Sequence, residues 1–82
     1  MTWYVYILSC RDGTLYTGIT NDLDRRIRAH NDGKGAKYTR SRGPVKVVYR
    51  EIYESRSMAQ KREYKIKQWT RTTKLRLVQS AR

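Results

Sequence analysis

The chain has few of the residues that build disulfides or metal centres. Its 82 residues include one cysteine, Cys10, and one histidine, His30. A lone cysteine forms no internal disulfide, and these two residues lack the ligand spacing of a zinc site. Cys10 is therefore interpreted as a small residue that packs at the end of a strand.

Long apolar runs, repeats and linkers are also absent from the sequence. The N-terminal run of apolar and aromatic residues, 3–8, is too short for a signal peptide or a membrane span, and no charged segment precedes it. Pro44 is the only proline. A chain of this length holds one modest core, so we expect a single domain over residues 1–82 in a cytoplasmic protein without a membrane partner.

Acidic residues are few, whereas basic residues lie along the whole chain. Nineteen lysines and arginines stand against seven acids, which gives a formal net charge of +12. Charge of one sign at this level opposes a compact state, and a polyanion relieves the repulsion. Nucleic acid is therefore the expected partner, and an acidic protein or a membrane surface is the alternative.

The first twenty residues predict a β-hairpin. Two runs rich in β-branched and aromatic residues, 3–9 and 14–20, flank a turn that contains Asp12-Gly13. A two-residue loop would place Tyr6 and Tyr16 on opposite faces of the sheet, because a shift of one residue reverses every side chain.

A three-residue loop, with Gly13 in the left-handed region, is the register that we favour. It places Tyr6 opposite Gly18 and Tyr16 opposite Leu8, so both phenols lie on one face beside a position without a side chain.

A first helix is predicted to begin after Asn21-Asp22, which supplies the N-cap, and to end at Gly33. Helical spacing places Leu23 and Ile27 on its buried stripe. Arg26 and His30 fall at the edge of that stripe.

Residues 33–44 form a glycine-rich basic loop without helical or strand periodicity, which we expect to be mobile without a partner. Its basic side chains and the lysine just after it are predicted to contact the nucleic-acid backbone without reading sequence. They are Lys34, Lys37, Arg40, Arg42 and Lys46.

The C-terminal half predicts a third strand over residues 45–53 and a second helix that begins with a capping box at 57–60 and runs to about Trp69. Glu63 falls on the inward arc of that helix, where an unpaired charge is unusual. A last short helix over 74–78, capped by Thr72 or Thr73, is predicted to cover the sheet.

Five side chains on core-adjacent edges have the chemistry that phosphodiester hydrolysis needs. The reaction requires a proton acceptor, a cation for the developing phosphoryl charge and usually a metal ion. A tyrosine serves as base where positive charge lowers its pKa, an arginine fork suits phosphate, and one carboxylate suits a divalent ion. The five are Tyr6, Tyr16, Arg26, His30 and Glu63.

Each of the five also has a purely structural interpretation. The tyrosines can be packing residues at the rim of the sheet, and His30 can stabilise the end of its helix. Arg26 can be a solvated charge, and Glu63 can pair with an arginine such as Arg26.

The sequence resembles the GIY-YIG nuclease domain. Tyr4-Val5-Tyr6 stands where that family has G-I-Y, and Tyr16-Thr17-Gly18 stands where it has Y-I-G. The match continues through Arg26 and His30 and again at residues 59–63, so that it covers nearly the whole chain. It is most similar to the small stand-alone bacterial members, which have no separate DNA-binding domain.

The resemblance implies an α/β chain of the α+β type, with a three-stranded antiparallel sheet flanked by helices in the order β-β-α-β-α-α. It implies cleavage of DNA with one Mg²⁺ or Mn²⁺ ion bound by Glu63. Tyr6 and Tyr16 match the motif tyrosines, one of which serves as or assists the general base. Arg26 matches the arginine that stabilises the scissile phosphate, and His30 matches the position that assists the base or orients the substrate.

Three functions follow as hypotheses. The first is a metal-dependent DNA endonuclease, which we expect to be a monomer. The second is a module that binds structured DNA or RNA and cleaves it poorly or not at all. The third is a regulatory partner within a larger repair or ribosomal complex.

Overall fold

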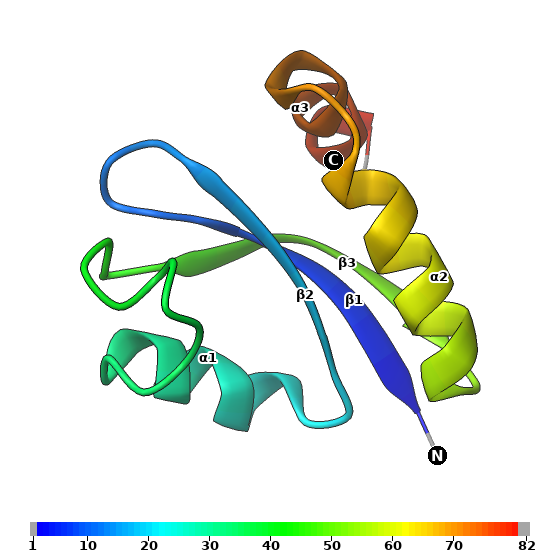
Figure 1. Cartoon of the computed structure of the whole chain (residues 1–82), viewed down its shortest axis with the longest axis horizontal. Coiled ribbons are helices and arrows are strands. Elements are labelled where there is room, and N and C mark those ends of the chain that lie inside the picture. Colours follow the sequence, from blue (N-terminus) through cyan, green and yellow to red (C-terminus); the bar gives the residue numbers. More distant parts are fainter. Residues whose placement is uncertain (1, 81–82) are drawn as a thin grey trace.

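The computed structural model describes residues 2–80 and consists of one three-stranded antiparallel sheet and three helices (Figure 1). The strand order is β2-β1-β3, with β1 in the centre. The predicted α+β fold and its β-β-α-β-α-α order are confirmed. In chain order the elements are β1 (Trp3–Ser9), β2 (Leu15–Thr20), α1 (Leu23–Asn31), β3 (Lys46–Tyr53), α2 (Arg56–Lys67) and α3 (Arg71–Ser80).

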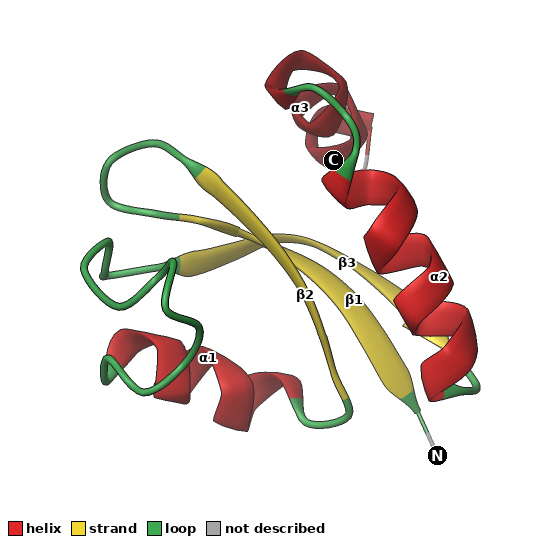
Figure 2. Cartoon of the chain, in the orientation of Figure 1, coloured by secondary structure: helices red, strands yellow, loops and turns green. Residues whose placement is uncertain are grey.

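The sheet is covered on both faces, which explains why β1 is almost continuously apolar. Val5 and Ile7 pack with α2 and α3, whereas Tyr6 and Leu8 face α1, and all four are at most 1% exposed. Side chains alternate between the faces of a strand, so the two halves of the core share one strand. Figure 2 shows α1 and the pair α2 and α3 on opposite sides of the sheet.

The β1–β2 hairpin has the three-residue loop that the sequence favours. The backbone N–H of Cys10 donates to Thr14 O at 2.9 Å, and Gly13 has a φ of 83°. Tyr6 pairs with Gly18, and Leu8 pairs with Tyr16. Both phenols therefore lie on one face of the sheet, as predicted, and α1 covers this face. Cys10 is 5% exposed at the end of β1, in agreement with its interpretation as a packing residue.

The helix starts are partly as predicted. Asp22 caps α1 by accepting from the N–H of Arg25, and Gly33 follows its end with a φ of 75°. The predicted cap of α2 at Ser57 is wrong, because Ser55 has the extended backbone and its hydroxyl accepts from Met58 N. Likewise, α3 begins at Arg71, and the hydroxyl of Thr70 accepts from Thr73 N.

A carboxylate of β3 connects the sheet to α2. Glu51 accepts from the hydroxyls of Tyr49 and Tyr53 at 2.5 and 2.7 Å, and Arg62 of α2 donates to its two oxygens, each at 2.9 Å. Burial opposes ionisation of Glu51, but the hydrogen bonds from Arg62 and the two tyrosines prevail and hold its pKa below the usual value. Burial and the bond to Glu51 raise the pKa of Tyr49 to about 12.

Within residues 2–80, none of the helices has the length and apolar character that a membrane span requires.

We predict that Glu51→Gln lowers the free energy of unfolding by about 1–3 kcal/mol, because the variant weakens a bidentate contact in a partly buried site. Urea denaturation at pH 7 measures the change. Glu54→Gln is the matched control, since Glu54 is exposed at the end of the same segment. Equal stability of the two variants would contradict the role given to Glu51.

Candidate active site

Tyr6 and Tyr16 form the floor of the candidate site on the α1 face of the sheet. Tyr6 is 1% exposed and Tyr16 is partly buried, and their ring centroids are 6.4 Å apart. Gly18 leaves the space for the Tyr6 phenol, because a Cβ at this position would lie 2.5 Å from Tyr6 Oη and 2.7 Å from Cζ. Any side chain at position 18 would displace the ring.

His30 lies deeper than the sequence predicts. Helical spacing places it at the edge of the buried stripe, yet it is 1% exposed and is the buried member of α1 among that helix's described residues. Leu23 and Ile27, the predicted stripe, are only partly buried. The imidazole can be buried because both its nitrogens have partners.

The two ring nitrogens of His30 connect β1 to the basic loop. Nε2 lies 3.0 Å from Tyr6 Oη. Nδ1 lies 2.6 Å from the hydroxyl of Thr39, which is 0% exposed, and accepts weakly from Ala36 N at 3.4 Å. The ring also contacts Tyr16, with centroids 5.3 Å apart. One imidazole therefore holds the loop, the helix and both phenols together.

The pKa of Tyr6 is raised, contrary to the expectation that excess positive charge lowers it. Burial is the largest cause, and the charges of Tyr16 and Glu63 act in the same direction. The nearby Arg26 lowers the pKa, but burial prevails. Arg26 therefore lies near the phenol; helical spacing predicts only that it lies at the edge of the buried stripe. Burial, and then the charge of Arg26, lowers the pKa of His30.

Glu63 reaches the site from α2. Its side chain is 21% exposed and pairs with Lys67 at 3.4 Å, rather than with the arginine considered from the sequence. Lys67 Nζ in turn lies 5.8 Å from the centre of the Tyr16 ring. The Lys67 side chain is 49% exposed, and ion pairs that are open to solvent contribute little to stability.

A divalent ion such as Mg²⁺ or Mn²⁺ could find a carboxylate ligand in Glu63. Across the described residues, no three or more histidine, cysteine, aspartate or glutamate side chains gather to hold a metal ion. Glu63 would be the one carboxylate ligand, and Mg²⁺ commonly keeps several waters beside one or two carboxylates.

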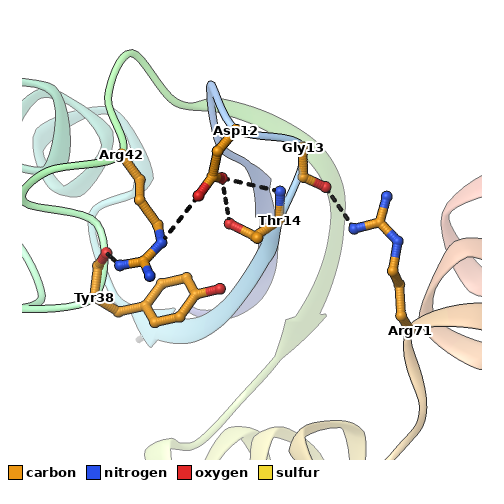
Figure 3. A network of polar contacts seen from close by, with 6 residues as sticks. All are labelled: Asp12, Gly13, Thr14, Tyr38, Arg42 and Arg71. Atoms are coloured by element: carbon orange, nitrogen blue, oxygen red, sulfur yellow. Dashed lines mark hydrogen bonds and ion pairs between the residues drawn. The ribbon is translucent and has the colours of Figure 1, made fainter.

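The basic loop is anchored to the hairpin turn and to Tyr16, which the sequence does not predict. Arg42 Nε donates to Asp12 Oδ2 at 3.1 Å, and Nη1 donates to Tyr38 O at 2.8 Å (Figure 3). The guanidinium lies 4.2 Å from the centre of the Tyr38 ring, and that ring stacks on Tyr16 at 5.9 Å. Arg42 is thus engaged within the protein, whereas Lys34, Lys37, Arg40 and Lys46 are exposed.

A second basic contact extends the site toward α3. Arg71 donates to Gly13 O at 2.5 Å on the other side of the hairpin turn (Figure 3). Arg71 and Lys74 line a hollow of about 190 Å³ with Tyr38, next to Tyr16. A hollow of about 340 Å³ is lined by Arg25 and Arg26.

Five residues that the structure places at this site were not identified from the sequence: Tyr38, Thr39, Lys67, Arg71 and Lys74. Tyr38 and Thr39 lie in a loop without periodicity, and their partners are far away in sequence. Lys67 follows Glu63 by four residues, a spacing that allows an ion pair on a helix, so this contact could have been predicted from the sequence. A larger hollow, about 570 Å³, lies between α1 and β3 and is lined by none of the five predicted residues.

Comparison with known proteins gives one consistent result. The model of the GIY-YIG catalytic domain matches residues 2–76. A UPF0213 protein of Clostridium perfringens is 62% identical over 77 residues, which cover 94% of this chain and 83% of that protein. A UPF0213 protein of Staphylococcus aureus is 56% identical over 75 residues, which cover 92% of each.

Two solution structures are also similar. A UPF0213 protein from Bacillus halodurans superposes with a TM-score of 0.62 at 51% identity, covering 96% of this chain and 84% of that one. A protein from E. faecalis superposes with a TM-score of 0.66 at 40% identity, covering 98% and 85%.

The buried histidine predicts how stability depends on pH. Because the folded-state pKa of His30 is lowered, the unfolded chain binds its proton first as pH falls below about 6.5. The free energy of unfolding is therefore expected to fall between about pH 6.5 and 5, above the range in which carboxylates titrate. Urea denaturation of wild type and His30→Gln measures it. The variant should lack the slope, and a wild-type stability that is constant or rises as pH falls would contradict the prediction.

Proposed function

The chain belongs to the GIY-YIG catalytic domain family, and from this premise we propose that it is an endonuclease that hydrolyses phosphodiester bonds in DNA with one divalent ion, Mg²⁺ or Mn²⁺. The observation that supports the proposal best is the contact of Tyr6 Oη with His30 Nε2 at 3.0 Å beside Arg26. Packing alone does not require a guanidinium beside a buried pair of phenol and imidazole.

In this proposal Tyr6 accepts the proton of the attacking water. Its raised pKa makes the phenolate scarce at neutral pH but strongly basic once formed. Arg26, which is partly buried beside Tyr6, presents a planar fork to the oxygens of the scissile phosphate. Tyr16, under the ring of Tyr38, orients the nucleotide.

Glu63 is the residue proposed to hold the divalent ion. When bound, such an ion supplies a Lewis acid that neutralises charge on a phosphoryl oxygen. The carboxylate is partly exposed, and its charge already reaches Tyr6. Glu63 pairs with Lys67 in the free protein, so the ammonium group of Lys67 must leave the carboxylate before a divalent ion binds there.

The exposed part of the basic loop is proposed to bind the DNA backbone. Lys34, Lys37, Arg40 and Lys46 are exposed, and Arg71 and Lys74 extend the positive surface past the hairpin turn. Lysine and arginine contacts with phosphate position a protein without reading sequence. A monomeric state and a place in a larger repair complex stay predictions.

A binding module without cleavage is the second candidate. The Glu63–Lys67 ion pair and the low exposure of Tyr6 favour it, because both must change before the reaction proceeds. Strong binding with no cleavage of any substrate would support this function over the first.

Cleavage of labelled single-stranded, duplex, nicked and branched DNA with Mg²⁺ or Mn²⁺ tests the proposal. We expect Glu63→Gln and Tyr6→Phe to lose activity by about 10²- to 10⁴-fold while DNA binding persists. Tyr64→Phe is the matched control, since Tyr64 follows Glu63 and is 71% exposed. If the wild type cleaves and both variants cleave equally well, the assigned roles are wrong.

The rate is predicted to depend on pH in the way that a phenolate base requires. The population of the Tyr6 phenolate rises about tenfold per pH unit below its pKa, so kcat/KM should rise with this slope from about pH 7 to 9. Tyr16→Phe is the control that should keep the slope. A base at His30, whose pKa is lowered, would instead give a rate that is constant above pH 7.

Lys37→Ala and Arg40→Ala are predicted to weaken binding about equally for DNAs of different sequence. The slope of log K against log salt is negative, and each substitution should reduce its magnitude by about 0.9, the value for one lost phosphate contact. Fluorescence anisotropy at several salt concentrations measures this slope. Lys61→Ala, an exposed residue of α2, is the control. A loss of affinity for only one sequence would show base recognition instead.

A further inference from the structure

A hollow on the α3 side of the hairpin turn has cationic walls and no acidic residue. Its volume is about 190 Å³, and its lining consists of Thr14, Leu15, Tyr38, Arg71 and Lys74. Among the ion pairs of residues 2–80, none includes Arg71 or Lys74. Two cations beside one small hollow repel each other, and an anion bound between them relieves the repulsion.

Two walls of the hollow are held in place by the rest of the protein. Arg71 donates to Gly13 O at 2.5 Å, and its guanidinium carries further N–H donors that this bond leaves for a ligand. Tyr38 is held from the loop, because the Arg42 guanidinium lies 4.2 Å from its ring centre and the ring stacks on Tyr16. Figure 3 shows Tyr38 extending from the loop toward the side of the turn where Arg71 lies. These walls are therefore positioned before a ligand arrives.

The position of the two cations within α3 favours a binding role over a structural one. The helix begins at Arg71, so Arg71 and Lys74 both lie in its first turn, which contains no acidic residue. Cations at this end oppose the helix dipole and lower the stability of the helix. Lys74 is partly buried beside the hollow, and within residues 2–80 no ion pair offsets this cost. The stability of the fold therefore does not account for a lysine at this position.

The hollow adjoins the candidate active site through Tyr16. The ring centroids of Tyr6 and Tyr16 are 6.4 Å apart, and those of Tyr16 and Tyr38 are 5.9 Å apart. Two ring contacts thus separate the proposed base from a wall of the hollow. Successive phosphates of one DNA strand are spaced by about 3.4 Å along the helix axis, so one strand can reach both places within a few nucleotides.

We propose that this hollow binds one backbone phosphate of the DNA strand that is cleaved, a few nucleotides from the scissile bond, through the cationic groups of Arg71 and Lys74. The position of this phosphate relative to the scissile bond rests on the proposed nuclease function, whereas the phosphate site itself does not depend on cleavage. The basic loop contacts the DNA on one side of the hairpin turn and α3 contacts it on the other. A strand held at both places lies across Tyr16.

Fluorescence anisotropy with a labelled single-stranded oligonucleotide, without a divalent ion, tests the site apart from cleavage. At about 0.1 M salt we expect Lys74→Gln to weaken binding about fivefold and to reduce the magnitude of the slope of log K against log salt by about 0.7, the value for one contact with a single strand. Arg76→Gln is the matched control, because Arg76 is an exposed residue of the same helix and does not line the hollow. Equal losses in the two variants would show attraction by net charge alone and would overturn the proposal.

Urea denaturation of the same variants separates a binding role of Lys74 from a structural one. We expect the free energy of unfolding of Lys74→Gln to equal or exceed that of the wild type, because the substitution removes a cation from the first turn of a helix. A Lys74→Gln variant that is less stable than the wild type would assign a structural role to Lys74 and would contradict the proposal.

Neutral methylphosphonates, placed one at a time along a cleaved strand, locate the phosphate. We expect one position within a few nucleotides of the scissile bond where this substitution slows cleavage by the wild type and by Arg76→Gln but has no further effect on Lys74→Gln. The absence of such a position would refute the placement beside the active site. If the wild type binds DNA and cleaves none, the nuclease function fails, and the anisotropy result still decides whether the phosphate site exists.

Discussion

The contact between Tyr6 Oη and His30 Nε2 is the interaction on which the rest of the site depends. It joins the central strand to the end of α1 across 24 residues of sequence. Gly18 must lack a side chain to admit the phenol, and the hairpin must have a three-residue loop to set Gly18 opposite Tyr6. Because both partners are polar and buried, each must remain hydrogen-bonded for the fold to be stable. The same bond thus serves stability and the proposed chemistry.

The electrostatics of the site differ from those of the molecule as a whole. A net charge of +12 favours a polyanion at the surface, yet burial decides the protonation of the central phenol and raises its pKa. Charge therefore acts at two distances: exposed lysines and arginines are proposed to attract the phosphates, whereas Arg26, Tyr16 and Glu63 act on the buried phenol. Lys67 pairs with Glu63 and so offsets the one carboxylate charge that acts on the phenol.

Local patterns predict the parts of this structure that local forces determine. The register of the hairpin follows from Gly13 and the spacing of the tyrosines, and Asp22 caps α1 as expected. Local sequence patterns do not predict a side chain's position where contacts with residues distant in sequence determine it. Helical spacing predicts His30 at the edge of the buried stripe, but the side chain is buried. Its burial depends on the hydroxyl of Thr39, nine residues away, which the periodicity of the helix cannot predict. Ser55 and Ser57 both suit a helix start, and the end of β3 at Tyr53 selects the earlier one.

The most direct test of whether burial controls the site is the titration of Tyr6, followed by carbon-13 NMR of its Cζ. Burial beside His30 predicts that the phenol keeps its proton beyond pH 10, the ordinary midpoint for tyrosine. Tyr64, which is 71% exposed, supplies an internal reference in the same spectra. A Tyr6 midpoint below that of Tyr64 would mean that positive charge prevails over burial, and it would contradict the conclusion that burial sets the protonation of the proposed base.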